Sequence, residues 1–487
     1  MISPTDVTEI STLEDKSSVF KFSDFSPIVI PKTLSVVDLP EDIYSYIAEF
    51  LHRSDMNHFL SASAALYQEF KQSHFYWQLT PINSAHYYNS MKFRSKIRWL
   101  CKNPQNQVGV TVCSPLLRHA YPFSGCNFVD LSGCKKLTDV GGLGNVQTLK
   151  LARCIKIVDV SMLGAVHTLN LAGCLGVSDV SKLGSVHTLN LAGCLGVSDV
   201  SKLGSIYSLN LSSCHNVRDV KDLGNVHRLD LSNLSRGLDV SALGSVHTLN
   251  LSSCYGLSGV GSLLNVHTLN LTACDSFTGI DALGNVRNLN LSLCTWLCDV
   301  HALGKVHSVN LSYCSRLTDV SALGNVHTLR LNGCSGLMDV SSLGSVHHLE
   351  LAKCSNIIDI GALGSVYHLT LSGCVNVTDV SALGKVHVLD LSSCRLVTDV
   401  SSLGDVRDLN LSYCYNISDV SNLGQVYNLN LSYCVNVTTV NQLAQVHALN
   451  LSYCHNIADL DTINENYNYG GRILKLSQYM RSHMLWH

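Results

Sequence analysis

Apolar residues recur along most of this chain with a period of 20 residues. In the unit 326–345 (VHTLRLNGCSGLMDVSSLGS), seven positions are apolar or carry a thiol, and nearly every other unit repeats them. Alignment from Cys126 to Leu460 gives 17 units, the last incomplete, without insertion or deletion between them. A fixed period of this length is typical of a solenoid, in which each unit buries its apolar face by stacking on its neighbours.

Each unit is expected to contain one strand and one short return. Leu329 and Leu331 alternate with polar neighbours, which is the period of a strand with one buried face. Only ten residues lead from Cys334 to Gly344, too few for an α-helix and its turns, so we expect a 3-10 turn or an extended return. Asp339 is expected to cap the free amides of that turn, and Gly344 to supply a positive φ.

The spacing Leu-x-x-Leu-x-Leu-x-x-Cys resembles the leucine-rich repeat, with Val at its first apolar place. The return Asp-Val-Ser-x-Leu-Gly is similar to the short returns of internalin-type repeats, shortened further. The resemblance covers about two thirds of the chain. It implies an α/β, mostly β fold: a leucine-rich-repeat solenoid with a parallel concave sheet and short 3-10 or extended returns.

Cysteine placement favours a structural role for most thiols. The chain has 20 cysteines, and 16 of them, from Cys134 to Cys454, occupy one repeat position, where Leu234 is the only substitute. Equivalent residues of stacked units point the same way, so we expect a reduced ladder of buried thiols that donate weakly to loop carbonyls. Disulfides or a chain of metal ions are the alternatives. The four other cysteines form no C-x-x-C pair, so zinc has no support.

Composition narrows the class of protein. The 487 residues, 46% of them hydrophobic, are ample for a large core, and the formal charge of −3 argues against a general electrostatic grip on nucleic acid. No apolar run approaches the length of a membrane span, and the first residues lack the basic and apolar regions of a signal peptide. We therefore expect an intracellular protein, cytoplasmic or nuclear, with no membrane contact and no cofactor.

Helical spacing precedes the repeats. Pro40 stands where a helix begins, acidic residues follow it, and Ile43, Ile47 and Leu51 continue at helical spacing. With a second segment that starts at Asp55, this stretch resembles an F-box, the small helical module that docks onto the Skp adaptor subunit of SCF-type ubiquitin ligases. The residues that carry the resemblance are Leu39, Pro40, Ile43, Ile47, Leu51, Met56, Phe59 and Trp77.

The resemblance to the F-box implies that these eight residues bind a Skp-like adaptor protein and, through it, a cullin. The sequence departs from the family pattern in two places. Arg53 stands where the family usually has Pro, and Ala-Ser-Ala-Ala-Leu at 62–66 replaces its Val-Cys-Arg-x-Trp run. These departures leave open how tightly a Skp subunit is held. A plain helical cap on the solenoid is the alternative.

The chain therefore divides into five parts. We expect a disordered N-terminus at 1–35, an F-box-like helical module at 36–83 and a linker with an N-terminal cap at 84–125. The solenoid of 17 units spans 126–460, and a C-terminal cap follows at 461–487.

Two exposed rows are expected to be structural. Ten histidines, with Tyr or Arg in other copies, fill the place just before the strand, and stacked imidazoles should stay largely neutral because neighbouring cations repel. A linear row also offers few converging ligands for a metal ion. Ten asparagines fill a strand position and are expected to hydrogen-bond along the stack.

Exposed residues that differ from the common repeat are the candidates for recognition, because a surface that is the same on every unit offers no specific site. Charged residues and histidines gather on a few neighbouring units: Arg330, His348, Glu350, Lys353, His368 and Asp390. Tyrosine, a frequent interface anchor, forms a row near the C-terminal end at Tyr413, Tyr433 and Tyr453, with Tyr313 further back. The candidate target-binding residues are Tyr313, Arg330, His348, Glu350, Lys353, Tyr413, Tyr433 and Tyr453. Drift among copied units is the alternative.

No catalytic motif appears: there is no nucleophile elbow, P-loop, His-Glu-x-x-His run or dinucleotide fingerprint. The sequence therefore predicts a protein that is not an enzyme. The expected function is that of a substrate-recognition adaptor of an SCF-type ubiquitin ligase, with the solenoid binding an unidentified target protein. A non-enzymatic protein-interaction scaffold without any link to ubiquitin is the alternative.

Overall fold

The computed structural model describes residues 76–78, 81–92, 94–95, 107–114, 116–234 and 237–459. The chain forms two compact units, and the second of them, 79–91 with 108–487, contains the repeats. The predictions for residues 1–75 and 460–487 lie outside the described residues. They comprise the disordered N-terminus, most of the F-box-like module and the C-terminal cap.

One strand recurs in every unit of the repeat, and we call each such 20-residue unit a rung. The α-helix α4 (Pro81–Asn89) precedes the repeats, and β1 (Tyr76–Gln78) belongs to the first compact unit. The strands that follow are β2 (Gln107–Thr111), β3 (Phe128–Asp130), β4 (Thr148–Lys150), β5 (Thr168–Asn170), β6 (Thr188–Asn190), β7 (Ser208–Asn210), β8 (Arg228–Asp230), β9 (Thr248–Asn250), β10 (Thr268–Asn270), β11 (Asn288–Asn290), β12 (Ser308–Asn310), β13 (Thr328–Arg330), β14 (His348–Glu350), β15 (His368–Thr370), β16 (Val388–Asp390), β17 (Asp408–Asn410), β18 (Asn428–Asn430) and β19 (Ala448–Asn450).

Short 3-10 turns form the returns of most rungs. They are η5 (Tyr121–Phe123), η6 (Gly141–Leu143), η7 (Ser161–Leu163), η8 (Lys221–Leu223), η9 (Ser241–Leu243), η10 (Val260–Leu263), η11 (Ile280–Asn285), η12 (His301–Lys305), η13 (Ser321–Asn325), η14 (Ser341–Leu343), η15 (Gly361–Ser365), η16 (Ser381–Lys385), η17 (Ser401–Leu403), η18 (Ser421–Gln425) and η19 (Asn441–Gln445). The two rungs after β5 and β6 return through plain turns instead.

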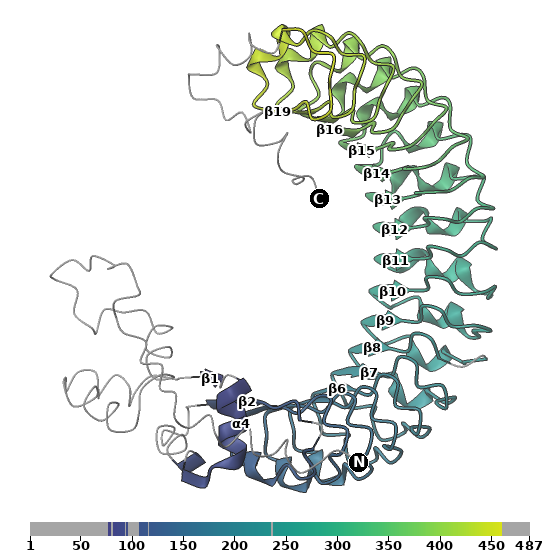
Figure 1. Cartoon of the computed structure of the whole chain (residues 1–487). Helices are drawn as coiled ribbons and strands as arrows, with labels where there is room; N and C mark the ends of the chain where they lie inside the picture. The colour runs from purple at the N-terminus through teal and green to yellow at the C-terminus, as the bar shows by residue number, and fades with distance from the viewer. Residues whose placement is uncertain are drawn as a thin grey trace, which may run out of the picture. The chain divides into compact units, whose positions relative to one another are not determined.

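The strands of the second unit form a continuous parallel sheet. From β2 to β19 each strand pairs with the next, and within the repeats the register is 20 residues, so that Leu329 lies opposite Leu349. Within this unit the strands run along the inner side and the 3-10 turns along the outer side (Figure 1). The predicted fold is confirmed, because this arrangement is a leucine-rich-repeat solenoid with short returns.

The core consists of the seven positions that the period identifies. In the unit 326–345 all seven side chains are at most 1% exposed. Burying one leucine side chain contributes about 2 kcal/mol. Stacking therefore stabilises the whole array through one repeated set of residues.

The cysteine ladder lies inside this core. Cys334 Sγ donates a hydrogen bond to the carbonyl oxygen of Leu311 on the preceding rung, at 3.2 Å. The expected bond from thiol to loop carbonyl is thus confirmed. Burial raises the pKa of the Cys334 thiol to about 12, and every cysteine in the described part of the chain is a free thiol. These protonated, buried thiols are poor nucleophiles.

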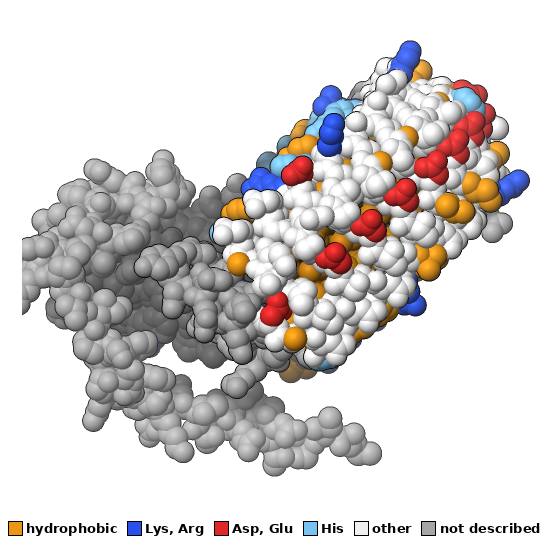
Figure 2. All heavy atoms as spheres, turned by 90° about the horizontal axis from the view of Figure 1, so that it is seen from above, with side chains coloured by type: hydrophobic (Ala, Val, Ile, Leu, Met, Phe, Trp, Pro, Cys, Tyr) orange, Lys and Arg blue, Asp and Glu red, His pale blue; other side chains and the backbone are white. Residues whose placement is uncertain are grey.

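The repeated aspartate caps the turn as expected. The backbone N–H of Ser341 donates to Asp339 Oδ1 at 2.8 Å, and hydrogen bonds from Ser341 lower the pKa of the Asp339 carboxyl. Equivalent bonds recur from rung to rung, as for Asp159 with Ser161. Acidic side chains accordingly form a row along the surface shown in Figure 2.

The reason given for the repeated glycine is wrong. Gly344 has a φ of −63°, in the right-handed region, so it needs no positive φ. A Cβ atom at Gly344 would lie 2.3 Å from the carbonyl oxygen of Ala362 on the next rung. Close stacking therefore favours glycine at this rung, while Leu264 and Ala444 occupy the same position on η10 and η19. Left-handed backbone occurs elsewhere, just after the strand, as in Tyr313 (φ 63°) and Gly333 (φ 68°).

Candidate interaction surface

The strands lie on the inner side of the solenoid, and we call their solvent-exposed residues the inner face. These residues are much the same on most rungs. On β5 the side chains of Thr168 and Asn170 face outward on either side of buried Leu169. Asn170 Oδ1 accepts the backbone N–H of Ala172 at 2.9 Å, and the same bond recurs on other rungs. This bond lies within one rung, so the expectation that the asparagines bond along the stack is corrected.

The histidine row forms a stack of rings beside the inner face. The ring centroids of His167 and His187 are 4.6 Å apart, and those of His187 and Tyr207 are 4.8 Å apart. Burial lowers the pKa of His227, and the neighbouring His247 and Arg228 add to the shift. His227 is therefore neutral at neutral pH, as the sequence predicts for this row.

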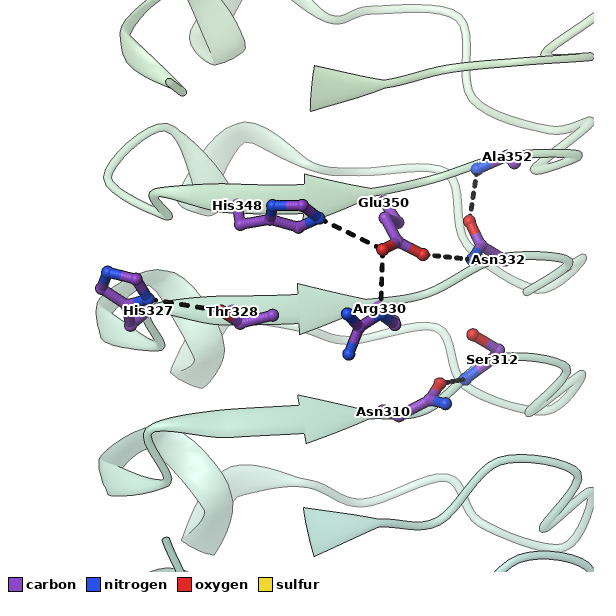
Figure 3. A network of polar contacts seen from close by, with 9 residues as sticks. All are labelled: Asn310, Ser312, His327, Thr328, Arg330, Asn332, His348, Glu350 and Ala352. Carbon is purple, nitrogen blue, oxygen red and sulfur yellow. Dashed lines mark hydrogen bonds and ion pairs between the residues drawn. The ribbon is translucent and has the colours of Figure 1, made fainter. Parts of the chain in front are cut away.

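A charged network interrupts the uniform face on β13 and β14 (Figure 3). Arg330 Nε donates to Glu350 Oε1 at 2.8 Å, and Asn332 Nδ2 donates to Glu350 Oε2 at 2.8 Å. His348 Nε2 lies 3.2 Å from the same Oε1 atom. Burial disfavours the charge on Glu350, but the donors from Asn332, Arg330 and His348 outweigh it and hold its pKa below the usual value. Glu350 is thus a carboxylate at neutral pH.

The network also replaces the backbone bond that asparagine makes on uniform rungs. Glu350 stands at the asparagine position and leaves the backbone N–H of Ala352 without its usual acceptor. Asn332 Oδ1 on the preceding rung accepts that N–H at 2.8 Å. The substitutions on two rungs are therefore complementary: Asn332 serves both the carboxylate and the amide.

The polar surface continues over the next three strands. The rings of His348 and His368 are 4.2 Å apart, with planes inclined at 32°. Burial lowers the pKa of His368, and the neighbouring His348 lowers it further. The carboxylates of Glu350, Asp390 and Asp408 act in the opposite direction, but the net shift is downward. Asp390 Oδ1 accepts the backbone N–H of Ser392 at 2.8 Å.

The predicted target-binding residues fall into two groups. Arg330, His348 and Glu350 meet in the network just described. The other five occupy the left-handed position that follows the strand, with φ between 59° and 63°: Tyr313, Lys353, Tyr413, Tyr433 and Tyr453. Lys353 therefore stands at the tyrosine position, three residues after Glu350, and not with the charged residues of the strands.

Three tyrosines of the second group form an aromatic stack. The ring centroids of Tyr413 and Tyr433 are 4.3 Å apart, as are those of Tyr433 and Tyr453. Burial and hydrogen bonds with the two flanking tyrosines raise the pKa of Tyr433 to about 12. Tyr313 lies five rungs from Tyr413 and is outside this stack, and the ammonium group of Lys353 has no acidic partner in the described part of the chain.

The list of candidates missed two residues of the surface, Asn332 and Asp408. Each had a signal in the sequence, since Asn332 stands where the other rungs have Ala, Ser or Thr, and Asp408 is the one acidic residue at its strand position. The amide of Asn428 donates to Asp408 Oδ1.

Most of the residues predicted to bind a Skp subunit cannot be placed. Those from Leu39 to Phe59 lie outside the described residues. Trp77 lies in strand β1. Among the described helices none has the length and apolar character needed to cross a membrane. The described residues also include no group of three or more His, Cys, Asp or Glu side chains that could hold a metal ion.

Comparisons with known proteins find similarity in solved structures alone. No protein-family model matches the chain, and no curated protein matches it. An internalin (inlF) from Listeria monocytogenes is 17% identical, with a TM-score of 0.33 over 69% of this chain and 83% of that one. The functional domain of InlJ from the same species, which includes a cysteine ladder, is 19% identical, with a TM-score of 0.35 over 67% of each chain.

A leucine-rich-repeat protein from Leptospira interrogans is 16% identical, with a TM-score of 0.39 over 74% of this chain and all (100%) of that one. At such identities the likeness concerns the repeat fold alone. The chain described here is a leucine-rich-repeat protein in its fold.

Proposed function

We propose that this protein is a non-enzymatic binding protein that holds a protein partner on the inner face of β12 to β19 and on the left-handed positions that follow these strands. The network around Glu350 is the observation that carries the proposal. A glutamate in place of asparagine would by itself leave the Ala352 amide without an acceptor. Arg330 and Asn332 on the neighbouring rung supply the missing partners for both groups. Drift of single copies does not readily produce such complementary changes.

The tyrosine stack supports the same assignment. Tyr413 and Tyr453 are each 39% exposed although they pack against Tyr433. Rigid, partly exposed aromatic rings are frequent anchors of protein interfaces, because they bury a large area with little loss of side-chain entropy. The stack follows β17 to β19 and so lies on the C-terminal side of the charged residues of β13 to β17.

The test compares the proteins that copurify with the full chain and with a variant carrying Tyr413→Ser, Tyr433→Ser and Tyr453→Ser. Serine already occupies this left-handed position at Ser393 (φ 62°), so the variant should fold. We expect the variant to lose a specific partner that the parent retains. Arg153→Ser, at the same repeat position outside this region, is the control and should retain the partner. An unchanged set of bound proteins in the tyrosine variant contradicts the proposal.

The finer proposal is that of an adaptor of an SCF-type ubiquitin ligase. It rests on the resemblance of Leu39, Pro40, Ile43, Ile47, Leu51, Met56, Phe59 and Trp77 to an F-box. In this function the helical module binds a Skp-like subunit, and through it a cullin, while the solenoid presents the target. The mechanism is positional and requires no catalytic residue in this chain.

A pull-down with a purified Skp subunit tests the adaptor proposal. We expect capture of the full chain and loss of capture in a variant with Leu39→Ala, Pro40→Ala and Ile43→Ala. Circular dichroism should show that the solenoid of the variant is still folded. Failure to capture either chain contradicts the adaptor function and favours a scaffold whose helical region caps the solenoid.

A further inference from the structure

We propose that the inner face of β13 to β17 selects a polypeptide segment with one carboxylate and one cation about four extended residues apart. The carboxylate would bind Arg330, and the cation would bind Asp390 and Asp408. This inference rests on the proposed function of the inner face as a protein-binding surface and names the chemistry of the partner.

Arg330 provides the cationic end of the surface. It pairs with Glu350 through Nε, and its two terminal nitrogens have no acceptor among the described residues. Figure 3 shows these nitrogens turned away from the carboxylate. The Arg330 side chain is 40% exposed, so a ligand can reach it. A guanidinium offers parallel N–H donors that match the two oxygens of a carboxylate.

Glu350 fixes the position of that guanidinium. Both of its oxygens already accept hydrogen bonds from Arg330 and Asn332, and its side chain is only 22% exposed. The carboxylate therefore has little capacity left for a partner and acts as a positioning residue for Arg330. Such preorganisation reduces the entropy that a long side chain loses on binding.

Asp390 and Asp408 provide the anionic end. Each uses its Oδ1 atom within the scaffold, Asp390 for the N–H of Ser392 and Asp408 for the amide of Asn428. Neither has a cationic partner in the part of the chain that the structure describes. Their Oδ2 atoms remain free to accept an ammonium or guanidinium group. A polyanion such as nucleic acid is disfavoured, because these two carboxylates would repel it.

The rungs of β14 and β15 separate the two ends. In line with the ends these rungs carry Glu350, which already pairs with Arg330, and Thr370, and beside them lie His348 and His368 with ring centroids 4.2 Å apart. Burial together with His348 lowers the pKa of His368. Arg330 and Asp390 occupy the same strand position on rungs three apart. Three strand spacings of ~4.8 Å make ~14 Å. An extended chain covers that distance in about four residues.

The experiment selects binders from a displayed library of random peptides on the full-length protein and then measures the affinity of the synthesised peptides. We expect the enriched peptides to pair an acidic and a basic residue about four positions apart. Arg330→Asn should lower the affinity for these peptides about tenfold, because their acidic residue loses its partner. The double variant Asp390→Asn, Asp408→Thr should lower it about tenfold, because their basic residue loses its partners.

The chain supplies its own conservative replacements and a matched control. Asparagine is the residue that most other rungs carry at the position of Arg330 and Asp390, and threonine is the most frequent residue at the position of Asp408, so the variants restore the common repeat. Asp230→Asn is the control, because Asp230 occupies the position of Asp390 on β8 and makes the same bond, to the N–H of Ser232 at 2.9 Å. It should leave the affinity unchanged. Replacing the peptide's basic residue by alanine should weaken binding to the parent but not further weaken binding to the double variant.

Three outcomes would overturn the inference. The first is enrichment of peptides that lack paired charges. If the tyrosine variant no longer binds those peptides, the proposed function still stands. The second is an equal loss in Asp230→Asn, which shows a general charge effect. The third is enrichment of no peptide that depends on any residue of the inner face, which overturns the proposed function as well.

Discussion

Two regions of the same solenoid differ in how much their exposed residues vary. The units 166–185 and 186–205 are identical in every residue, whereas the rungs of β13 to β17 keep the buried set and change the exposed strand residues. Leu189 and Leu349 are equivalent and are 1% and 0% exposed. The comparison teaches that the two regions share one buried set. The exposed positions are free to acquire a function, and those of the second region have diverged.

The largest effect should be the same in both regions if the core is truly shared. Leu189→Ala and Leu349→Ala each remove a fully buried side chain and leave a cavity, so each should lower the free energy of unfolding by about 3 kcal/mol. Chemical denaturation followed by circular dichroism measures both. A large loss in one region with a small loss in the other would show that the two regions are packed differently.

The close contact at the return glycine should come next in size. A Cβ atom at Gly184 or Gly344 would lie 2.3 Å from a backbone oxygen of the following rung. Either Gly→Ala variant should therefore lower the free energy of unfolding by about 2 kcal/mol, because the rungs must move apart to admit the methyl group. The same denaturation experiment measures this loss. Ala444 occupies this position on the return η19, so Ala444→Gly is the control and should cost less than about 1 kcal/mol. Tolerance of alanine at Gly344 alone would indicate looser stacking in the diverged region.

Glu350→Gln tests a difference between the regions, because the first region has no equivalent network. The variant should lower the free energy of unfolding by about 1 kcal/mol near neutral pH, since the charge-assisted bonds to Glu350 weaken. The pKa of Glu350 is lowered in the folded protein, so its contribution is present above the ordinary value of about 4.3 and is lost as the pH falls through the folded pKa.

Unfolding measured from about pH 7 to about pH 3 checks this pH dependence. The parent should lose more stability in acid than Glu350→Gln does. The variant Arg330→Asn, Asn332→Ser, Glu350→Asn restores the common repeat and should keep its stability at both ends of the range. Parallel acid curves for the parent and Glu350→Gln would contradict a lowered pKa.

The smallest effect concerns the histidine stack and should have the same sign at His227, before β8, and at His307, before β12, which lie just outside the two regions. Burial lowers the pKa of His227 and of His307, so the unfolded chain takes up a proton before the folded protein does. The parent should therefore lose stability as the pH falls below about 6.5, until the folded pKa is passed. Tyr207 shows that the stack accepts tyrosine.

His227→Tyr and His307→Tyr should each reduce this loss on acidification. Thermal unfolding at two pH values, one on either side of the ordinary histidine pKa, measures it. The parent is the reference in each case. A greater acid sensitivity in either variant would show that the protonated imidazole stabilises the stack, contrary to the lowered pKa.

The fold was predictable from the sequence to a large extent because the period is exact to the residue. The buried set, the strand, the 3-10 return and the cap at Asp339 all follow from one unit of 20 residues. The role of Gly344 was not predictable in the same way. Its φ is ordinary, and the need for glycine arises from the carbonyl of Ala362 on another rung.

The candidate site was predictable as a list of unusual residues but not as an arrangement. Departure from the repeat singled out Arg330, Glu350 and the tyrosines, yet Asn332 was missed although it binds both Glu350 and the Ala352 amide. Residues 18 or 20 apart in the chain meet because the rungs stack in register. A sequence pattern gives the register, but it does not give the direction of a side chain or the atom that it bonds.

The sequence by itself determined the length of the rung, the residues that are buried and the positions at which rungs differ, because burial of apolar side chains follows periodicity. Only the tertiary structure decided which residues touch across rungs. It directed the asparagine bond to the same rung at Asn170, joined Arg330 to Glu350, and stacked the ring of Tyr413 on that of Tyr433. Hydrogen bonds and ring contacts depend on distances of a few ångströms between neighbouring rungs, and stacking sets those distances.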